Sequence, residues 1–139
     1  MRQAVHIFPI ATRGRGLVAF TSEVAGWLAA QEIETGLLTL FCRHTSASLL
    51  IQENADSDVL EDIESFFARL APEEPGRYRH DAEGPDDMPG HLRAALTDTQ
   101  LSIPVIGGRM ALGTWQGLYL FEHRRAPHRR EVAAHVIGT

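Results

Sequence analysis

The sequence predicts an α+β fold: one compact domain, residues 1–139, in which a mixed or antiparallel β-sheet is packed by two to three helices. Three observations lead to this class. A chain of 139 residues suits one hydrophobic core. Strand and helix patterns alternate over the first two-thirds of the chain, and mainly strand patterns follow. No internal repeat or low-complexity tract marks a second domain.

The first elements are predicted to be two strands and a helix. Residues 3–10 alternate well enough for a strand, and a glycine-containing turn leads into a second strand at 17–20. Thr21 or Ser22 can then cap a helix that runs over 21–31. Three apolar residues of this helix share one face, at the spacing i, i+3, i+4: Val24, Trp27 and Leu28.

The next strand pattern, at 36–42, is interrupted by the polar stretch RHTSAS at 43–48 before apolar residues resume at 49–51. A buried polar group without a hydrogen bond costs about 1–3 kcal/mol. These side chains must therefore be hydrogen-bonded within the fold or take part in function. Two explanations remain open. The stretch is either a functional site around His44 or a strand end at which three hydroxyls cap backbone groups: Thr45, Ser46 and Ser48.

The strongest helical pattern covers 56–70. Its apolar residues recur at helical spacing: Val59, Ile63, Phe66, Phe67 and Leu70. Residues 71–90 are punctuated by proline and glycine, which indicates a long loop, and loops of this length are usually functional or disordered. A short helix at about 88–96 follows.

The last third is predicted to consist of strands. They are expected at 101–106, 109–112, 118–121 and 130–137. Gly107 and Gly108 suit a two-residue hairpin turn between the first two of them. Pro104 indicates an edge position or a bulge, because proline cannot donate to a sheet ladder.

Composition narrows the classes of partner. The chain has 13 Lys+Arg against 18 Asp+Glu, a net charge of −5, which argues against a general nucleic-acid binder. The single cysteine, Cys42, rules out an internal disulfide, fits a reducing compartment and is expected to be a packed core thiol. No apolar stretch is long enough to span a membrane. We therefore expect a soluble, cytoplasmic protein without nucleic-acid or membrane partners.

Three histidines in polar surroundings are candidates for chemistry: His44, His80 and His91. His80 and His91 flank the loop, so the fold can bring both rings to one metal or phosphate, although their spacing matches no recognised zinc signature. A pair of surface histidines and an acid–base role remain alternatives. Nearby carboxylates are either supporting groups or a solvated acidic loop: Asp81, Glu83, Asp86 and Asp87.

Other candidates lie elsewhere in the chain. Glu53 precedes the 56–70 helix and Asp62 lies beside its apolar stripe. Trp115 and Gln116, flanked by glycines, indicate either a pocket wall or a Trp that closes the core. The segment 122–130 holds four arginines and two histidines, which suits a phosphate subsite or salt bridges to a neighbouring subunit better than a nucleic-acid patch.

Together these motifs resemble the YjbQ-type family, the secondary thiamine-phosphate synthase enzymes. The resemblance runs almost end to end, and its motifs occur in the family's order: HTSAS at 44–48, Glu53, Asn54, Asp56, Asp62, His80-Asp81, His91, GTWQ at 113–116, and Glu122. The chain departs from the family after Glu122, where an acidic residue and glycine are usual, and at 97–100, where many members have a glycine–serine turn.

The resemblance implies a large mixed sheet and a homotrimer with clefts at subunit boundaries. It implies that one site is lined by His44, Glu53, Asp62, His80, His91, Trp115, Gln116 and Glu122. We expect catalytic roles for His44, Glu53, Asp62 and Glu122. Substrate contacts are expected from Thr45, Ser46, Ser48, Trp115, Gln116, Arg129 and Arg130. A divalent metal, with zinc as the candidate, would be held by His44, His80 and His91.

The family name implies an activity on phosphorylated small molecules. An aminopyrimidine diphosphate would be joined to a thiazole phosphate, releasing pyrophosphate, as a secondary activity. Positive charge from Arg129 and Arg130, or from the metal, would stabilise the departing pyrophosphate. Two alternatives remain: a metal-dependent phosphate-ester hydrolase, and a non-enzymatic trimeric protein that binds a metabolite or a metal.

Overall fold

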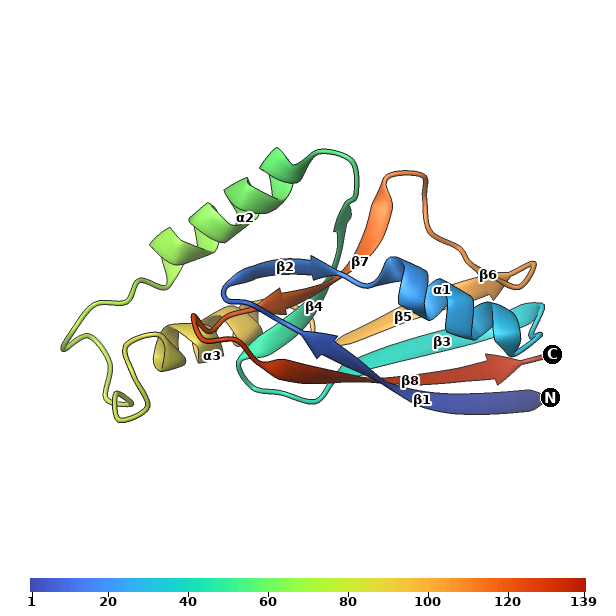
Figure 1. The fold of residues 1–139 in the computed structure, drawn as a ribbon, viewed down its shortest axis with the longest axis horizontal. Helices are drawn as coiled ribbons and strands as arrows, with labels where there is room; N and C mark the ends of the chain where they lie inside the picture. Colours follow the sequence, from blue (N-terminus) through green and yellow to red (C-terminus); the bar gives the residue numbers. More distant parts are fainter.

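The computed structural model describes residues 1–139 and confirms the α+β class. The chain forms eight strands and three helices: β1 (Arg2–Ala11), β2 (Gly16–Ala19), α1 (Thr21–Ala30), β3 (Thr35–Cys42), β4 (Ala47–Glu53), α2 (Ser57–Leu70), α3 (Asp87–Leu96), β5 (Gln100–Ile106), β6 (Arg109–Met110), β7 (Gln116–Glu122) and β8 (Arg129–Gly138). Both termini lie at one end of the molecule, and α2, α3 and the loop between them lie at the other (Figure 1).

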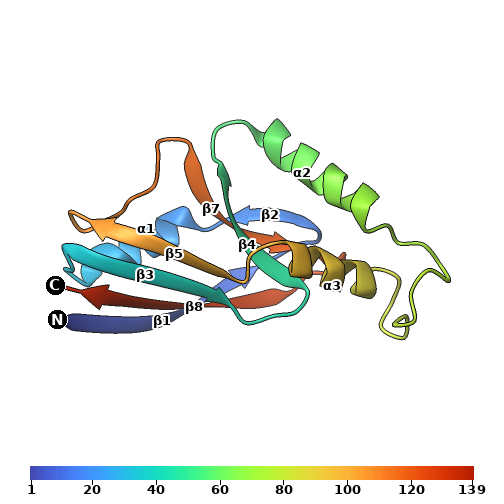
Figure 2. The same cartoon turned by 180° about the vertical axis from the view of Figure 1, so that it is seen from behind.

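The strands form two sheets, and every pairing between strands is antiparallel. One sheet has five strands in the order β1-β8-β3-β5-β6, and the other has three in the order β2-β7-β4. The edge or bulge expected at Pro104 fits this order, because the outer neighbour of β5 is the two-residue strand β6. Figures 1 and 2 show the three-stranded sheet crossing the end of the five-stranded sheet that lies away from the termini.

The core lies between the two sheets and α1. It is a cluster of 19 buried apolar residues, among them Val24 and Leu28 of α1 and Leu38 and Leu40 of β3. Cys42 belongs to this cluster, as expected, and burial raises the pKa of its thiol. The opposite face of the five-stranded sheet has no helix over it, so its apolar residues stay exposed: Val5, Ile7, Leu37, Phe41, Ile106 and Ile137.

The polar stretch at 43–48 is the main difference from the sequence prediction. One interrupted strand was expected there, but β3 ends at Cys42 in one sheet and β4 begins at Ala47 in the other. Residues 43–46 are the connection between the sheets. The prediction of a Thr21 or Ser22 cap was also wrong: Phe20 occupies the N-cap of α1, and the Thr21 hydroxyl accepts the amide of Leu118.

The predicted amphipathic helix is confirmed as α2, which the Asp56 carboxylate caps by accepting the amide of Asp58. None of its residues is fully buried, and Phe66 and Leu70 are each 51 % exposed. Figure 1 shows α2 at the periphery of the molecule, and the helix contacts the three-stranded sheet through Phe67, whose ring centre lies 5.6 Å from that of Phe121 on β7. None of the three helices is long and apolar enough to cross a membrane.

A buried ion pair joins the two sheets. Glu122 ends β7 and is fully buried; its carboxylate accepts hydrogen bonds from the Arg130 guanidinium at the start of β8 and from the Thr12 hydroxyl. Arg130 also donates to the carbonyl and hydroxyl of Ser46. Burial alone would raise the pKa of Glu122, but these donors outweigh burial and hold the pKa below its usual value.

Glu122→Gln is therefore expected to lower the free energy of unfolding by about 3–5 kcal/mol, because it leaves the buried Arg130 without a counter-charge. Urea unfolding measures the change. Glu131→Gln is the matched control, since its contact with Arg43 is half exposed, and it should change the free energy by less than about 0.5 kcal/mol. Equal effects of the two changes would contradict the assignment.

The Glu122–Arg130 pair also makes the free energy of unfolding depend on pH. A lowered folded-state pKa stabilises the fold fully above the pKa of an unfolded glutamate, about 4.3, and this contribution is lost as the pH falls through the folded value. The stability gap between the parent and Glu122→Gln should therefore shrink from pH 7 towards pH 3.

Candidate functional site

His80, Asp87 and His91 converge at the start of α3. Asp87 and His91 are four residues apart on the helix and so share one face, and His80 comes from the preceding loop. The Asp87 Oδ2 lies 2.6 Å from His80 Nε2 and 3.2 Å from His91 Nε2. One ligand atom from each residue lies within 4.8 Å of the other two. The fold thus brings His80 and His91 together, as the sequence suggested, and adds Asp87.

A backbone contact fixes the orientation of the His91 ring. Its Nδ1 lies 3.0 Å from the carbonyl oxygen of Thr45, which can only accept, so Nδ1 carries a proton. In the neutral ring Nε2 is then a lone pair that faces the Asp87 carboxylate oxygen. A proton on Nε2 or a cation between the two atoms removes this opposition. Two imidazoles and a carboxylate, with one imidazole held from behind by a carbonyl, form a donor set that suits zinc and related divalent metals.

Arg124 holds the carboxylate of Asp87 from behind. Its Nη1 donates to Asp87 Oδ1 at 2.8 Å and its Nε donates to Asp86 Oδ2 at 3.1 Å. Burial alone would raise the pKa of Asp87, but the hydrogen bond from His80 and the charge of Arg124 outweigh it, and the pKa lies below its usual value. The hydrogen bond to Asp87 in turn raises the pKa of His80. Asp87 therefore stays ionised and correctly oriented.

Packing against α2 and β7 positions α3. The buried Arg93 pairs with Glu64 of α2, with its guanidinium carbon 5.2 Å from the centre of the Phe121 ring. At the end of the helix the Thr97 hydroxyl donates to Ser48 of β4 at 2.6 Å. These contacts fix the helix that carries two of the three converging side chains.

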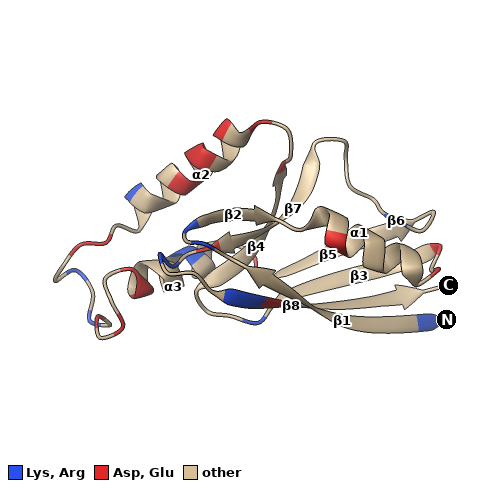
Figure 3. Cartoon of the chain, viewed as in Figure 1, with Lys and Arg blue, Asp and Glu red and all other residues tan.

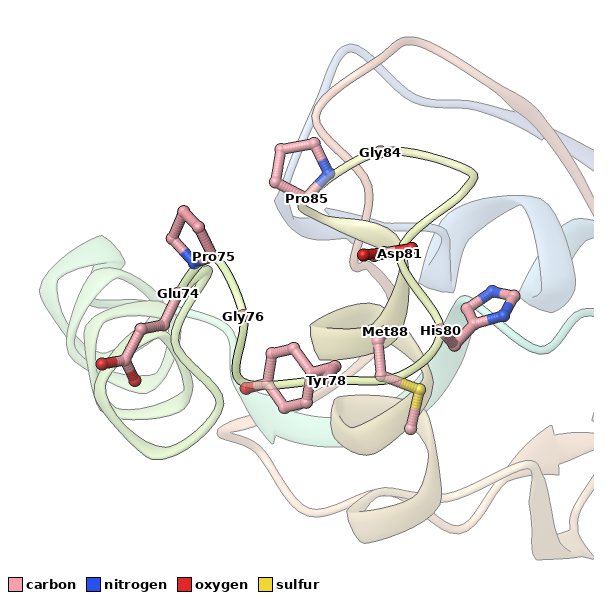
Figure 4. A pocket seen from close by; sticks show the side chains of 9 residues that line it. All are labelled: Glu74, Pro75, Gly76, Tyr78, His80, Asp81, Gly84, Pro85 and Met88. Carbon is pink, nitrogen blue, oxygen red and sulfur yellow. The ribbon is translucent and has the colours of Figure 1, made fainter.

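Two pockets adjoin the three converging residues. The first, of about 220 Å³, is formed by the loop before α3 and the first turn of that helix. Figure 4 shows its side chains, with His80 at the opposite end from Glu74, and Tyr78 and Met88 between them. Its charged lining groups are the carboxylates of Glu74 and Asp81, so it favours a polar or cationic group.

The second pocket, of about 560 Å³, is open and contains both His44 and His91. The His44 Nε2 accepts the amide of Glu131 at 2.7 Å, so in the neutral ring the proton is on Nδ1. Burial and the charge of Arg130 lower the pKa of His44. His44 is not among the converging ligand atoms; it lines the pocket as a neutral donor rather than joining His80 and His91 at one cation.

Of the three hydroxyl side chains in the 43–48 stretch, two are buried and one is exposed. Ser46 is buried and bonded to Arg130, and Ser48 is buried and lies 2.8 Å from Nε2 of His123. Burial lowers the pKa of His123 to about 3, so this histidine, which sequence analysis did not single out, is a neutral internal group. Only Thr45 is exposed at the second pocket. For Ser46 and Ser48 the geometry favours an internal role over substrate contact.

The arginine-rich segment is largely engaged by acidic residues. Arg130 is buried with Glu122, so neither is placed to meet a phosphate or exchange a proton with substrate. Arg125 pairs with Glu73 on the long loop. Arg129, by contrast, is exposed at the start of β8. The expected phosphate trap formed jointly by Arg129 and Arg130 is therefore absent from the geometry.

The remaining predicted residues lie at the far end of β4 and β7. Ala47 pairs with Glu122 at one end of this ladder and Glu53 pairs with Gln116 at the other. Six residues of strand separate these ends by about 20 Å. Glu53, Gln116 and the 64 % exposed Trp115 thus lie far from His91 within one chain, and Asp62 is exposed on α2. A single chain does not bring the whole expected set together.

Comparison with known proteins places the chain in a family. It belongs to the family described as UPF0047 protein YjbQ-like, whose model matches residues 6–139. It is 56 % identical over 137 residues to the UPF0047 protein sll1880 of Synechocystis, covering 99 % of this chain and 93 % of that protein. It is 42 % identical to the UPF0047 protein YjbQ of Escherichia coli O157:H7, covering 93 % and 94 %.

Solved structures agree with the fold. A protein of the yjbq/upf0047 family from Clostridium acetobutylicum is 31 % identical and superposes with a TM-score of 0.87, covering 95 % of this chain and 99 % of that one. A YbjQ-like protein from Sulfolobus solfataricus, 21 % identical, superposes with a TM-score of 0.86 over 99 % and 100 % of the two chains and supports the fold alone.

The converging residues predict one zinc ion per chain. Asp87→Asn and His91→Ala should each weaken Zn²⁺ binding by at least about 100-fold, because each removes a ligand, whereas second-sphere changes cost about 10–100-fold. His44→Ala should bind as the parent does, because its ring is fixed to Glu131. Calorimetric titration of metal-free protein measures all four affinities. Loss of binding in His44→Ala but not in Asp87→Asn would restore the ligand set expected from the sequence.

Proposed function

We propose that the chain is a metal-dependent enzyme that acts on a phosphorylated small molecule, with a divalent cation, zinc in the first instance, held by His80, Asp87 and His91. The observation that carries this proposal is the His91 ring, whose Nδ1 is fixed by a carbonyl while Nε2 faces a carboxylate oxygen. A bound divalent cation would supply positive charge to a phosphate or diphosphate group.

The protein's own residues then have separate tasks. Arg124 keeps Asp87 ionised and oriented, and the Thr45 carbonyl keeps the Nε2 of His91 directed at the same point. The ring of His80 is 45 % exposed, so the site is open to solvent and to a substrate from one side. The His44 Nδ1 proton is a fixed donor in the adjoining pocket.

The finer proposal is a thiamine-phosphate synthase-like activity. In that reaction the bond between a pyrimidine methylene carbon and its diphosphate oxygen breaks, pyrophosphate leaves, and the thiazole nitrogen lone pair forms the new C–N bond. The step needs positive charge beside the departing diphosphate, which the proposed cation would provide. Family resemblance supports this substrate pair, and the open pocket of about 560 Å³ that His91 lines is the larger of the two pockets beside the proposed cation.

A metal-dependent phosphate-ester hydrolase is the second candidate. The same ligand set is an open one, with three protein ligands and space for water, as in hydrolytic zinc sites. It would release phosphate from one substrate without a thiazole acceptor.

We also infer that copies of this chain associate through the uncovered face of the five-stranded sheet, in line with the expected homotrimer. Figure 3 shows Asp and Glu gathered along α2, whereas the strands of this sheet carry few charges. On the uncovered face Val5, Ile7 and Ile137 are exposed, and two charged residues, Arg129 and Glu131, lie at the start of β8. Four strands of this length present roughly 20 by 23 Å of sheet, and another copy of the chain can cover its apolar part.

Activity is tested with an aminopyrimidine diphosphate, a thiazole phosphate and Zn²⁺, following thiamine phosphate and pyrophosphate together. The parent should form both, Asp87→Asn should lose at least about 100-fold in rate, and Arg109→Ala, on the distant strand β6, should match the parent. Phosphate release from a single ester without the acceptor would support the hydrolase instead. Stoichiometric zinc with no turnover on either substrate class would overturn the enzyme proposal.

Self-association is tested by native mass spectrometry. The parent should be oligomeric, and Val5→Asp should yield monomers because it places a charge on the apolar face, at a side chain that is 74 % exposed. Val5→Thr keeps the β-branched shape and should remain associated. Far-UV circular dichroism confirms that both variants are folded, and a monomeric parent would refute the proposal.

A further inference from the structure

The pocket beside His91 differs in charge from the pocket beside His80. The His91 pocket is lined by Arg43, His44, Thr45 and Thr99, and no carboxylate belongs to its lining. The other pocket carries two carboxylates and no arginine. The chain has a net charge of −5, but this pocket is lined by hydrogen-bond donors and by no carboxylate. It therefore favours the binding of an anion.

The donors of this pocket are available to a ligand. The Arg43 side chain is 51 % exposed, and its one ion pair is a 3.3 Å contact with the half-exposed Glu131. Exposed pairs of this kind contribute little, so the guanidinium can turn to a phosphate at small cost. The His44 ring is held by the amide of Glu131 with its Nδ1 proton free of that bond. Arg43 differs in this from the buried Arg130 and from Arg124, which is engaged by Asp86 and Asp87.

The rest of the pocket suits the organic part of a phosphate ester. Phe41, Ala94 and Ala95 supply apolar surface beside the polar groups. A volume of about 560 Å³ accommodates a ring together with a phosphate. His91 lines the same pocket and its Nε2 faces Asp87, so the pocket adjoins the residues proposed to hold the cation.

We propose that this pocket is the phosphate subsite of the enzyme, with the Arg43 guanidinium and the His44 Nδ1 proton as the anion contacts and Phe41 and Ala94 against the organic ring. The substrate class is therefore an aromatic or heteroaromatic phosphate ester. The assignment rests on the proposed function, since it names the substrate end of the same site. It adds Arg43, to which the sequence analysis assigned no role of its own although it belongs to the polar stretch at 43–48.

The experiment is a calorimetric titration of metal-free protein with phenyl phosphate and with inorganic phosphate. The parent should bind phenyl phosphate more tightly than inorganic phosphate, because only the former contacts the apolar floor. Arg43→Ala should weaken phenyl phosphate at least about 10-fold, and Arg43→Lys should recover part of the affinity, since lysine keeps the charge but loses the planar fork. Arg109→Ala is the matched control for loss of one exposed arginine and should bind as the parent does.

The outcomes separate this proposal from the proposed function. Unchanged phenyl phosphate binding in Arg43→Ala overturns the subsite, whatever the enzyme turns over. Zn²⁺ affinity should be the same in Arg43→Ala and the parent, because Arg43 is not among the converging ligands. Arg43-dependent binding in a protein that shows no turnover would keep the subsite and refute the enzyme. Equal affinity of the parent for phenyl phosphate and inorganic phosphate would refute the aromatic substrate class.

Discussion

The buried pair of Glu122 and Arg130 is the interaction on which the rest of the site depends. A carboxylate taken fully out of water is tolerated only when its charge and lone pairs are met, and Glu122 meets this condition through Arg130, Thr12 and the amide of Arg124. The last of these contacts extends the network outward. It fixes the backbone from which the Arg124 side chain reaches Asp87, so the order of the candidate cation site begins in the core.

The long loop before α3 is held by charge rather than by apolar packing. Arg125 and Arg15 both pair with Glu73 near its start, and Arg124 pairs with Asp86 near its end. The arginine segment thus holds the loop that carries His80 in place through ion pairs. If the whole segment bound phosphate, these ion pairs to the loop would be lost. We therefore place the proposed anion contact at Arg43, whose competing ion pair with Glu131 is exposed and weak.

Periodicity in the sequence predicted most elements, because α2 and the strands of the five-stranded sheet bury or present whole faces. It did not identify β4 as a separate strand, since Ala47–Glu53 lacks alternation and the buried Ser48, which contacts His123, lies between the core residues Ala47 and Leu49. The convergence of His80 and His91 could be suggested from their positions around the loop. The inward turn of Arg130 could not, because an arginine in a charged run has the same local sequence whether it faces a buried glutamate or solvent.

The length of the β4–β7 ladder separates the predicted site residues into two groups within one chain. Glu53 and Gln116, with Trp115 beside them, lie about 20 Å from the Ala47 end of the β4–β7 ladder, and the antiparallel register that sets this distance is continuous from Ala47 to Glu53. No local rearrangement of a loop closes such a gap. Phe41, however, belongs both to the His91 pocket and to the uncovered sheet face. A second copy packed on that face, as proposed above, would border the pocket.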